Sequence, residues 1–277
     1  MLADVLPYLR CPVCHGTLSP AGAAVRCGRG HSFDVARQGY VHLAPAGVTH
    51  PGDSAGMVAA RERLLTSGAY DFIDAALAAA APAERGLVID AGAGTGYHLG
   101  ALLDVRPASV GLAVDVAKPA LRRAARCHPR AGAVLADTWR RIPVADGVAT
   151  TLLNVFAPRN GVEFARVLRP GGTLLVVTPT RAHLAELIDR LRLLRVDPDK
   201  DDRIASSLAP WFRSTGDAVH TRRLPLTRSQ VRALVEMGPS ARHTDPALVV
   251  AALPEPVVTV TASVRVSRYR CRARPAG

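Results

Sequence analysis

Residues 88–96 read Val-Ile-Asp-Ala-Gly-Ala-Gly-Thr-Gly, and this stretch decides the fold. Its first four residues have the apolar character of a buried strand. The glycines at 92, 94 and 96 then allow a turn in which the backbone approaches a ligand. A helical pattern follows directly, and Asp90 lies at the strand end, two positions before Gly92. A strand, a Gly-rich turn and a helix are typical of the ligand-binding crossover of an open α/β sheet, so we expect Asp90, Gly92, Gly94 and Gly96 in a cofactor site.

Short apolar runs alternate with helical patterns around this stretch. Five runs fit buried parallel strands: 87–91, 109–115, 131–136, 149–155 and 173–178. Four segments between or after them fit helices: 97–103, 118–126, 162–168 and 183–194. Strands that alternate with helices form right-handed βαβ units, so the pattern predicts an α/β fold with a doubly wound, Rossmann-like sheet.

The segments before and after this core have their own patterns. Ser54 can cap a helix, and a second helix is expected over 70–80. After a charged stretch at 195–203, we expect a strand near 219–224 and a helix over 228–237. Residues 257–266 are rich in β-branched side chains and predict a last strand, placed as an antiparallel edge of the sheet.

Aspartates end two further predicted strands. Asp115 is placed to accept hydrogen bonds from both hydroxyls of a ribose, and Asp137 lies at the level of an adenine amino group. With Asp90, they favour S-adenosylmethionine, which carries no phosphate and requires no lysine in the loop. A nicotinamide cofactor stays open, because Asp115 would also hold its ribose, but the spacing is G-x-G-x-G and not G-x-G-x-x-G.

The sequence Asn-Val-Phe-Ala-Pro at 154–158 follows the fourth strand and faces the predicted reaction centre. We expect Asn154, Phe156 and Pro158 to position a planar, amide-like substrate, since an amide side chain and a rigid turn suit that purpose. The alternative is that Asn154 only caps the following turn. On the first interpretation, substituting Asn154 lowers turnover without affecting folding. The sequence identifies no general base.

Three cysteines and a histidine near the N-terminus have the spacing of a metal site. Cys11 and Cys14 enclose two residues, and Cys27 follows after twelve intervening residues, with His31 beyond a Gly-Arg-Gly turn. Two close pairs complete a tetrahedron, which predicts one structural Zn²⁺ with no open position. The alternative is a chance cluster of reduced thiols. The two other cysteines, 127 and 271, stand alone and are expected to be ordinary thiols.

The segment around this cluster is short and rich in turns. Gly16, Gly28 and Gly30 lie where such turns need positive φ or a close backbone approach. Phe33 and Tyr40 have two interpretations, bases stacked on aromatic rings or the minimal core of the segment. Four arginines surround the cluster: Arg10, Arg26, Arg29 and Arg37. We expect three parts: a zinc-binding RNA-recognition module at 1–45, a helical linker at 46–85 that begins with Pro/Gly-rich residues 46–53, and a catalytic domain at 86–277.

The net charge of the chain is +12, and almost all of the basic residues are arginines. Arginine pairs well with phosphate, so a polyanionic partner such as nucleic acid is expected. A GC-rich genome that encodes arginine in place of lysine would give the same composition. No apolar stretch is long enough for a membrane span and residues 1–10 do not resemble a signal peptide, so we expect a cytoplasmic protein.

With these residues considered together, the chain resembles the RlmA family of 23S rRNA guanine-N1 methyltransferases, nearly from end to end. The resemblance is closest to the tylosin- and mycinamicin-resistance enzymes of actinomycetes. Besides the metal ligands and the Gly-rich turn, the shared motifs are Gln38-Gly-Tyr-Val41, Met57-Val-Ala-Ala-Arg61, Gly68-x-Tyr70, Lys118-Pro-Ala, Asn154-Val-Phe-Ala-Pro-Arg-Asn160, Leu168-Arg-Pro-Gly-Gly172, His183-Leu-Ala-Glu-Leu and Met237-Gly-Pro-Ser240. Arg242 departs from the pattern, which has a tryptophan there.

The resemblance implies S-adenosylmethionine-dependent methylation of N1 of a guanine in a 23S rRNA hairpin at the peptide exit tunnel, with macrolide resistance as the purpose. It also implies a zinc module that contacts RNA and a homodimer with an RNA-binding cleft. Tyr70, His98, Leu99 and His183 are implied to lie against the cofactor. Two alternatives are a small-molecule methyltransferase, which the zinc module and charge disfavour, and a non-catalytic RNA-binding protein, which the intact Gly-rich turn disfavours.

Overall fold

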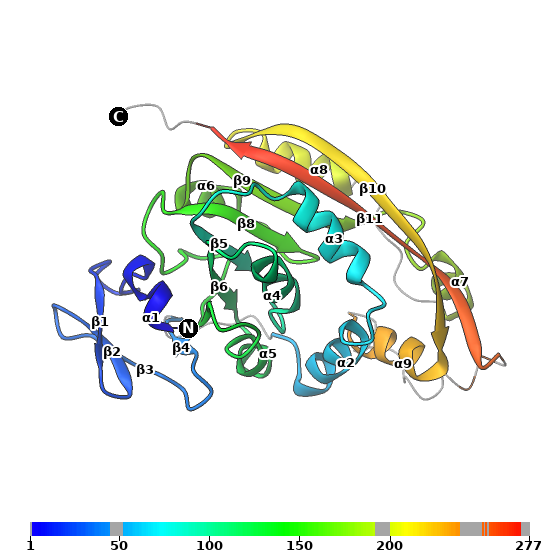
Figure 1. The fold of residues 1–277 in the computed structure, drawn as a ribbon, viewed down its shortest axis with the longest axis horizontal. Coiled ribbons are helices and arrows are strands. Elements are labelled where there is room, and N and C mark those ends of the chain that lie inside the picture. Colours follow the sequence, from blue (N-terminus) through cyan, green and yellow to red (C-terminus); the bar gives the residue numbers. More distant parts are fainter. Residues whose placement is uncertain are drawn as a thin grey trace.

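Figure 1 shows the fold, taken from a computed structural model that describes residues 2–44, 52–191, 200–238, 251, 253 and 255–272. The strands are β1 (Leu18–Ala21), β2 (Ala24–Cys27), β3 (Ser32–Asp34), β4 (Val41–His42), β5 (Leu87–Ala91), β6 (Val110–Asp115), β7 (Ala131–Leu135), β8 (Ala149–Val155), β9 (Leu168–Pro179), β10 (Phe212–Thr227) and β11 (Val257–Cys271). The helices are α1 (Leu2–Val5), the 3-10 helix η1 (Leu6–Tyr8), α2 (Ala55–Leu65), α3 (Asp71–Ala80), α4 (Tyr97–Asp104), α5 (Lys118–Ala124), α6 (Gly161–Val167), α7 (Ala185–Leu191), α8 (Lys200–Leu208) and α9 (Arg228–Glu236).

The larger sheet has eight strands in the order β10-β11-β9-β8-β5-β6-β7-β4. Strands β7, β6, β5, β8 and β9 are parallel, and these are the five that the apolar runs predict. The order reverses between β5 and β8, because β6 and β7 extend the sheet to one side and β9 to the other. The α/β fold class is therefore confirmed, with a topological switch point at the carboxyl end of β5.

The two ends of the larger sheet differ from the sequence-based expectation. The prediction that 257–266 forms an edge strand is wrong, because β11 is longer and lies antiparallel between β9 and β10. The edge is β10, which pairs with β11 along almost its whole length and extends well beyond the predicted 219–224. At the other edge, β4 pairs in parallel with β7, a partnership that two residues of sequence could not indicate.

Alternate residues of the parallel strands form two cores. Val88, Leu153 and their neighbours face α2, α3, α4, α5 and α9, where Leu64 and Leu77 are fully buried. Residues one position further on, such as Ile89, face α1, α6 and α8, with Phe164 at the centre. A parallel sheet covered on both faces requires apolar residues at every position, which is the pattern seen in the sequence.

Helix α7 is shorter than predicted at its N-terminal end. It begins at Ala185 because Leu184 has a left-handed φ of 58° and stops the helical pattern there. Residues 192–194 of the same prediction lie outside the described residues. So do residues 46–51 of the linker, residues 195–199 of the charged stretch and Arg242. In the described part of the chain, no helix is long and apolar enough to cross a membrane.

The N-terminal segment forms a small sheet of β1, β2 and β3 and is joined to the larger sheet at several points. The Leu43 N–H donates to Leu135 O at 3.0 Å, beside β4. Leu9 and Val144 form an antiparallel bridge, and the Arg10 N–H donates to Pro143 O at 2.9 Å. Leu9 and Val25 also belong to the same apolar cluster as β5, β6 and β7. The predicted 1–45 module thus shares its core with the larger sheet.

Candidate functional site

A cavity of about 620 Å³ lies at the carboxyl ends of the parallel strands. Its floor consists of the loops that follow β5, β6, β7 and β8, and α2 and the end of α9 form its opposite wall. Open α/β sheets bind their ligands in this place, outside the strand ends at the switch point. The cavity has the size of an ordinary small-molecule site.

The Gly-rich turn after β5 is shaped by left-handed backbone conformations. Gly92 has a φ of 83° and Gly94 a φ of 56°, which side-chain-bearing residues rarely adopt. A Cβ at Gly92 would lie only 2.5 Å from the Cβ of Ala157, so the turn also packs directly on the loop after β8. Gly96 caps α4 and does not line the cavity; a Cβ there would lie 2.8 Å from Cys127 Sγ.

Asp90 lies beneath the turn and is 2% exposed. Burial raises the pKa of its carboxyl to about 7, and nearby His98 opposes this rise while Asp115 adds to it. Its Oδ1 is buried and has no hydrogen-bond partner. A buried carboxylate with an unused oxygen is costly unless a donor or a cation approaches it, so the site can accept a positively charged group at this point.

Asp115 and Asp137 lie at the ends of β6 and β7, as their positions in the sequence predict. Asp115 accepts hydrogen bonds from the backbone N–H groups of Gly94 and Ala117, both at 2.8 Å, which ties the end of β6 to the Gly-rich turn. Asp137 Oδ1 accepts from the Trp139 N–H at 2.9 Å, while its buried Oδ2 has no hydrogen-bond partner. The cavity therefore contains two buried carboxylate oxygens without a hydrogen-bond partner, Asp90 Oδ1 and Asp137 Oδ2; the second also lies 3.8 Å from Arg140 Nε.

Nine predicted site residues line the cavity: Tyr70, Asp90, Gly92, Gly94, His98, Asp115, Asp137, Phe156 and Pro158. Four do not line it: Gly96, Leu99, Asn154 and His183. Leu99 is fully buried in the core of the sheet. The structure thus brings most of the predicted residues together around one space and places the remainder behind it.

Asn154 is completely buried and does not face the cavity, which corrects its predicted contact with substrate. Its Nδ2 donates to Ala91 O at 3.1 Å and to Pro158 O at 2.8 Å, linking the loops after β5 and β8. The amide caps the turn, as the alternative interpretation held, and it also positions the Gly-rich turn. A substitution here would leave buried carbonyls unpaired, so an effect on stability is now expected as well.

Phe156 is 43% exposed at the rim of the cavity, with a left-handed φ of 51° that is uncommon outside glycine. His183 lies behind it, with ring centroids 6.0 Å apart, and also lies 6.2 Å from the ring of Tyr70. His183 Nδ1 accepts from the Ser263 N–H at 3.1 Å, and burial lowers the pKa of His183 to about 4, so its ring is neutral. His183 thus supports two cavity residues from behind.

Arg61 and Trp139 are among the cavity side chains that were not predicted from the sequence. Arg61 is the only arginine or lysine that lines it in the described part of the chain. Its guanidinium pairs with Asp53, donates to Met237 O at 3.2 Å and lies beside the Gly-rich turn. Trp139 is 54% exposed and lies two residues after Asp137. The Met57–Arg61 motif was one signal for the first, and the scarcity of tryptophan, with two in the chain, was a signal for the second.

The four predicted metal ligands come together in the small N-terminal sheet. Their ligand atoms all lie within 4.8 Å of one another. Cys14 Sγ lies 3.6 Å from Cys27 Sγ, and His31 Nδ1 lies 3.2 Å from Cys27 Sγ and 3.6 Å from Cys11 Sγ. Zinc–ligand bonds of about 2.0–2.3 Å in a tetrahedron place neighbouring ligand atoms about 3.3–3.8 Å apart, so the cluster has the dimensions of a zinc site.

The turns around this cluster confirm the prediction for Gly30 and correct it for two other glycines. Gly28 has neither a positive φ nor an atom within 4 Å of a Cβ placed on it. Gly30 has a φ of 85° and its N–H donates to Cys27 O at 2.9 Å, as expected for a tight turn. In the other turn the left-handed residue is His15, with a φ of 58°, and not Gly16. Tyr40 is buried in the main core, and Phe33 is half-buried against the other apolar cluster. These contacts favour the core interpretation over stacking on bases.

The residues present fit S-adenosylmethionine on three observations. The cavity offers unused carboxylate oxygens at Asp90 and Asp137, which suit an ammonium and an amino group. It offers a single guanidinium, from Arg61, which suits a carboxylate. Its turn has glycine at positions 92 and 94, which line the cavity with backbone atoms alone. The donor set therefore matches a ligand that carries both charges of an amino acid and a neutral base.

Comparisons with known proteins agree with this site. Residues 9–50 match the zinc-ribbon family described as RlmA, N-terminal. The chain is 58% identical to a Micromonospora griseorubida protein provisionally named 23S rRNA (guanine-N(1)-)-methyltransferase, covering 98% of this chain and 99% of that protein. It is 48% identical to the 23S rRNA (guanine(748)-N(1))-methyltransferase of Streptomyces fradiae, covering 89% of this chain and 90% of that enzyme.

Among solved structures, the chain resembles one from the Haloferax volcanii complex between the Trm112 methyltransferase activator and a methyltransferase. The TM-score is 0.55 at 15% identity, with 81% of this chain and all of the other covered, which supports the methyltransferase fold alone. The similarity to the two relatives extends over at least 89% of this chain and 90% of each relative. The chain belongs to the RlmA family of 23S rRNA (guanine-N1)-methyltransferases.

Proposed function

We propose that this protein transfers a methyl group from S-adenosylmethionine to N1 of a guanine in 23S rRNA. The observation that carries the proposal is the cavity at the switch point, with carboxylates at three strand ends, in a chain 58% identical to a relative with that name. The proposed domain organisation is an RNA-recognition module at 1–45, a helical linker at 46–85 and a catalytic domain at 86–277.

The cofactor, when bound, supplies the methyl group of a sulfonium. After the transfer, the remainder of the cofactor is a neutral thioether. Asp90 would bind the ammonium of its methionine part, and Arg61 its carboxylate. Asp115 would accept from the ribose hydroxyls, and Asp137 Oδ2 from the adenine amino group. Each assignment pairs a cavity group with the ligand group of opposite charge or hydrogen-bonding character.

Catalysis in this site would consist mainly of positioning, with the proton of guanine N1 passing to water as the N1–methyl bond forms. Guanine N1 faces its Watson–Crick partner, so the base must leave its stem or stack before it can react. Phe156 projects from the loop after β8 in a strained conformation, which is a common feature of residues that hold a ligand. We propose that Phe156 and Pro158 hold the extruded base, while Asn154 keeps their loop in contact with the Gly-rich turn.

The cysteine–histidine cluster would hold one Zn²⁺ through all four ligands, Cys11, Cys14, Cys27 and His31. Four protein ligands leave no open position, so the ion would be structural and take no part in the reaction. An rRNA substrate would place the protein in the cytoplasm. A homodimer and a role in macrolide resistance are further proposals, which light scattering and growth of an expressing strain on macrolides would test.

The proposed activity is tested by incubating the purified protein with radiolabelled S-adenosylmethionine and 23S rRNA, followed by primer extension. N1 methylation prevents Watson–Crick pairing and leaves a stop at one guanine. Asp90→Asn serves as a control that should abolish labelling. RNA binding without labelled RNA would favour a non-catalytic RNA-binding protein, and labelling of small molecules alone would favour the small-molecule methyltransferase.

A further inference from the structure

Three consecutive residues, Trp139, Arg140 and Arg141, form an exposed turn at the mouth of the cavity, here called the 139–141 turn. Trp139 is 54% exposed and lines the cavity. The side chains of Arg140 and Arg141 are 50% and 48% exposed. Arg140 Nε lies 3.8 Å from the buried carboxylate of Asp137, which is beyond hydrogen-bond distance. Arg141 forms an exposed pair with Asp146 at 3.3 Å, and such surface pairs contribute little, so phosphate groups can still contact both arginines.

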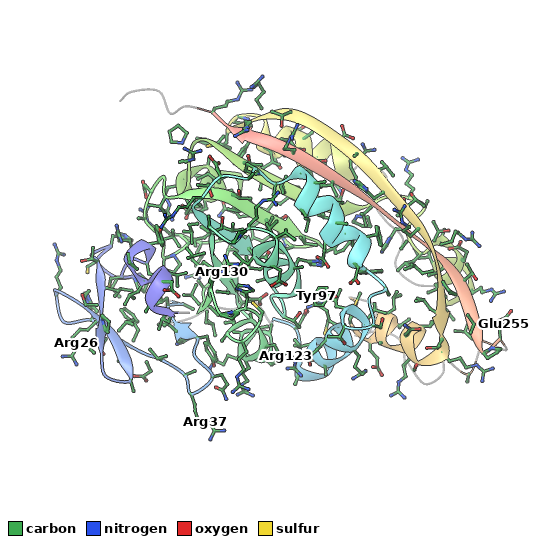
Figure 2. All side chains as sticks on the ribbon, in the orientation of Figure 1. Arg26, Arg37, Tyr97, Arg123, Arg130 and Glu255 are labelled. Atoms are coloured by element: carbon green, nitrogen blue, oxygen red, sulfur yellow. The ribbon has the colours of Figure 1, made fainter. Side chains whose placement is uncertain are left out.

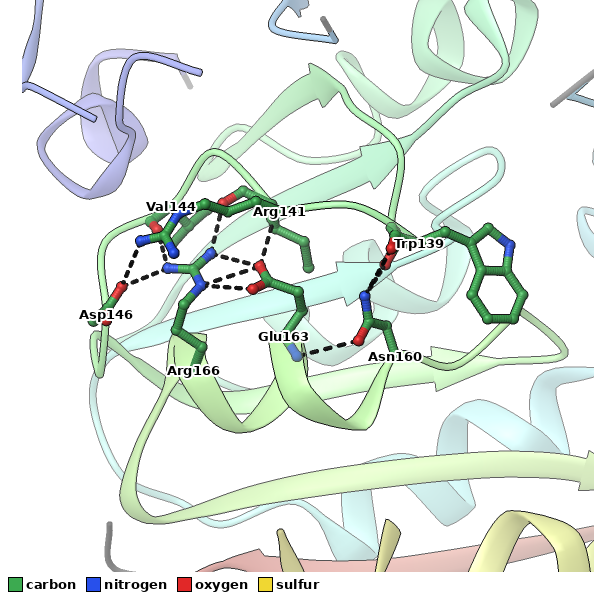
Figure 3. A network of polar contacts seen from close by, with 9 residues as sticks. Trp139, Arg141, Val144, Asp146, Asn160, Glu163 and Arg166 are labelled. Atoms are coloured by element: carbon green, nitrogen blue, oxygen red, sulfur yellow. Dashed lines mark hydrogen bonds and ion pairs between the residues drawn. The ribbon is translucent and has the colours of Figure 1, made fainter. Parts of the chain in front are cut away.

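The cavity end of the turn is held by Asn160, which caps α6. Its Nδ2 donates to the carbonyl oxygens of Thr138 and Trp139, each at 3.1 Å, and its Oδ1 accepts from the Glu163 N–H at 3.3 Å. The Trp139 N–H is bound by Asp137. Both backbone polar groups of Trp139 are thus engaged, and Figure 3 shows its indole pointing away from the polar network.

The segment that follows the turn is held from below by a buried ion pair. Arg166 and Glu163 are 7% and 8% exposed, and Arg166 Nη2 lies 2.7 Å from Glu163 Oε2. Arg166 also donates to Ile142 O at 2.7 Å and Val144 O at 2.8 Å, and the Ile142 N–H donates to Glu163 Oε2 at 2.8 Å (Figure 3). The backbone from 138 to 144 is therefore held in one conformation by side chains of α6.

The same segment reaches the zinc module. Pro143 O accepts from Arg10 N–H, and the Ala145 N–H donates to Tyr8 O at 2.9 Å, next to the bridge of Leu9 with Val144. The module in turn directs Arg26 and Arg37 into solvent (Figure 2). The segment that begins with the turn at the cavity thus continues into contact with the module.

The contacts within the fold do not explain why the indole of Trp139 is exposed. The network around it uses its backbone groups only, so the indole stabilises neither α6 nor the ion pair. A flat aromatic face stacks on any nucleobase, and a turn that is already ordered loses little entropy on binding. Adjacent arginines add contacts to phosphates and to bases.

We propose that the 139–141 turn is an RNA-contact platform on which Trp139 stacks against a nucleotide beside the target guanine while Arg140 and Arg141 contact its phosphates. The inference rests on the proposed methylation of 23S rRNA. It assigns the turn to substrate and not to cofactor, because the indole is the most exposed aromatic ring of the cavity and is followed by two exposed cations.

The test measures the binding of 23S rRNA transcript and of S-adenosylhomocysteine to the same variants of the full chain. Trp139→Ala should weaken RNA binding about 10-fold, in the range of one lost base stack, and leave S-adenosylhomocysteine affinity unchanged. Trp139→Phe should retain most of the affinity for RNA. Trp211→Ala, which removes an exposed tryptophan outside the cavity, should change neither.

Tryptophan fluorescence gives a second measurement, which RNA would not change if Trp139 had only a structural role. In a Trp211→Phe background, Trp139 is the only tryptophan, and RNA should quench its emission by stacking. Unchanged RNA affinity in Trp139→Ala, unquenched emission, or a loss of S-adenosylhomocysteine binding instead would overturn the inference. If the wild-type protein methylates 23S rRNA under the same conditions, such a result refutes only the proposed role of the 139–141 turn. If the wild-type protein does not methylate 23S rRNA, the proposed function itself is refuted.

Discussion

Asp90 and Arg61 show how single side chains give the cavity its chemical character. One is a buried carboxylate with an unpaired oxygen, and the other is the guanidinium that lines the same space. Their charges match the two charges of an amino acid. Asp90 was visible from its place before the Gly-rich turn, whereas Arg61 reaches the site only because α2 packs against α9 and the turn.

The pKa of Asp90 makes a prediction about pH. Burial raises this pKa to about 7 in the free protein, and a bound ammonium would lower it again. Below pH 7 binding must therefore release a proton, so the affinity for S-adenosylhomocysteine should fall by up to about tenfold per pH unit. Calorimetry from pH 5.5 to 8.5 would measure this. Asp90→Asn should bind more weakly and lose the dependence; a wild-type affinity that is flat below pH 7 would contradict the assignment.

The charge of Arg61 makes a prediction about ligand groups. Decarboxylated S-adenosylmethionine keeps the ammonium and lacks the carboxylate, so the wild-type protein should bind it more weakly than S-adenosylmethionine. Arg61→Gln should bind the two ligands with equal affinity, because it can no longer form the charged hydrogen bond to the carboxylate. That bond is worth about 1.5–3 kcal/mol, which is the expected difference between the two ligands in the wild-type protein. Asp53→Asn, which removes the partner of Arg61 but keeps the guanidinium, should still discriminate. Undiminished discrimination in Arg61→Gln would remove Arg61 from the carboxylate site.

At the scale of elements, α6 does more than cover one face of the sheet. Its N-cap and two of its side chains fix the loop that links the cavity with the zinc module (Figure 3). The helix has only seven residues, so its own hydrogen bonds provide little stability. The buried pair of Arg166 with Glu163, and the packing of Phe164 in the core, anchor it instead.

Breaking this pair should be costly. Arg166→Ala leaves the Glu163 carboxylate buried without its partner and frees the carbonyls of Ile142 and Val144, so we expect a loss of about 3–5 kcal/mol in the free energy of unfolding. Urea denaturation would measure it. Arg166→Ala combined with Glu163→Gln should recover part of the loss, because the unpaired charge is gone. A single variant as stable as the wild type would show that the pair does not hold the loop.

Across the whole molecule, the N-terminal segment that carries the cysteine–histidine cluster shares a core with the larger sheet. The small sheet lies at one end of the chain's fold in Figure 1, yet β4 extends the larger sheet and Val25 packs in the cluster that covers one of its faces. A small module with few apolar residues depends on its ion for folding. Loss of the ion would therefore also destabilise residues beyond 45.

Removal of zinc tests this connection. Chelation, or Cys14→Ser, should increase hydrogen exchange throughout residues 10–35 and also in β4 and β7, while β8 and β9 stay protected because they lie away from the β4 edge of the sheet. Cys127→Ser, a thiol outside the cluster, serves as the control. Exchange confined to the small sheet would show that the two parts are energetically independent, and unchanged exchange would mean that the cluster holds no structural ion.

The sequence by itself determined the local features of this protein. The Gly-rich turn, the aspartates at strand ends and the two ligand pairs each depend on residues a few positions apart, and spacing and backbone conformation specify such geometry directly. Only the tertiary structure decided that β11 lies inside the sheet, that β4 joins it, that Asn154 faces inward and that Arg61 and Trp139 line the cavity. These outcomes depend on packing between segments distant in the chain, as in the 176-residue separation of Arg61 from Met237, and no local pattern encodes that packing.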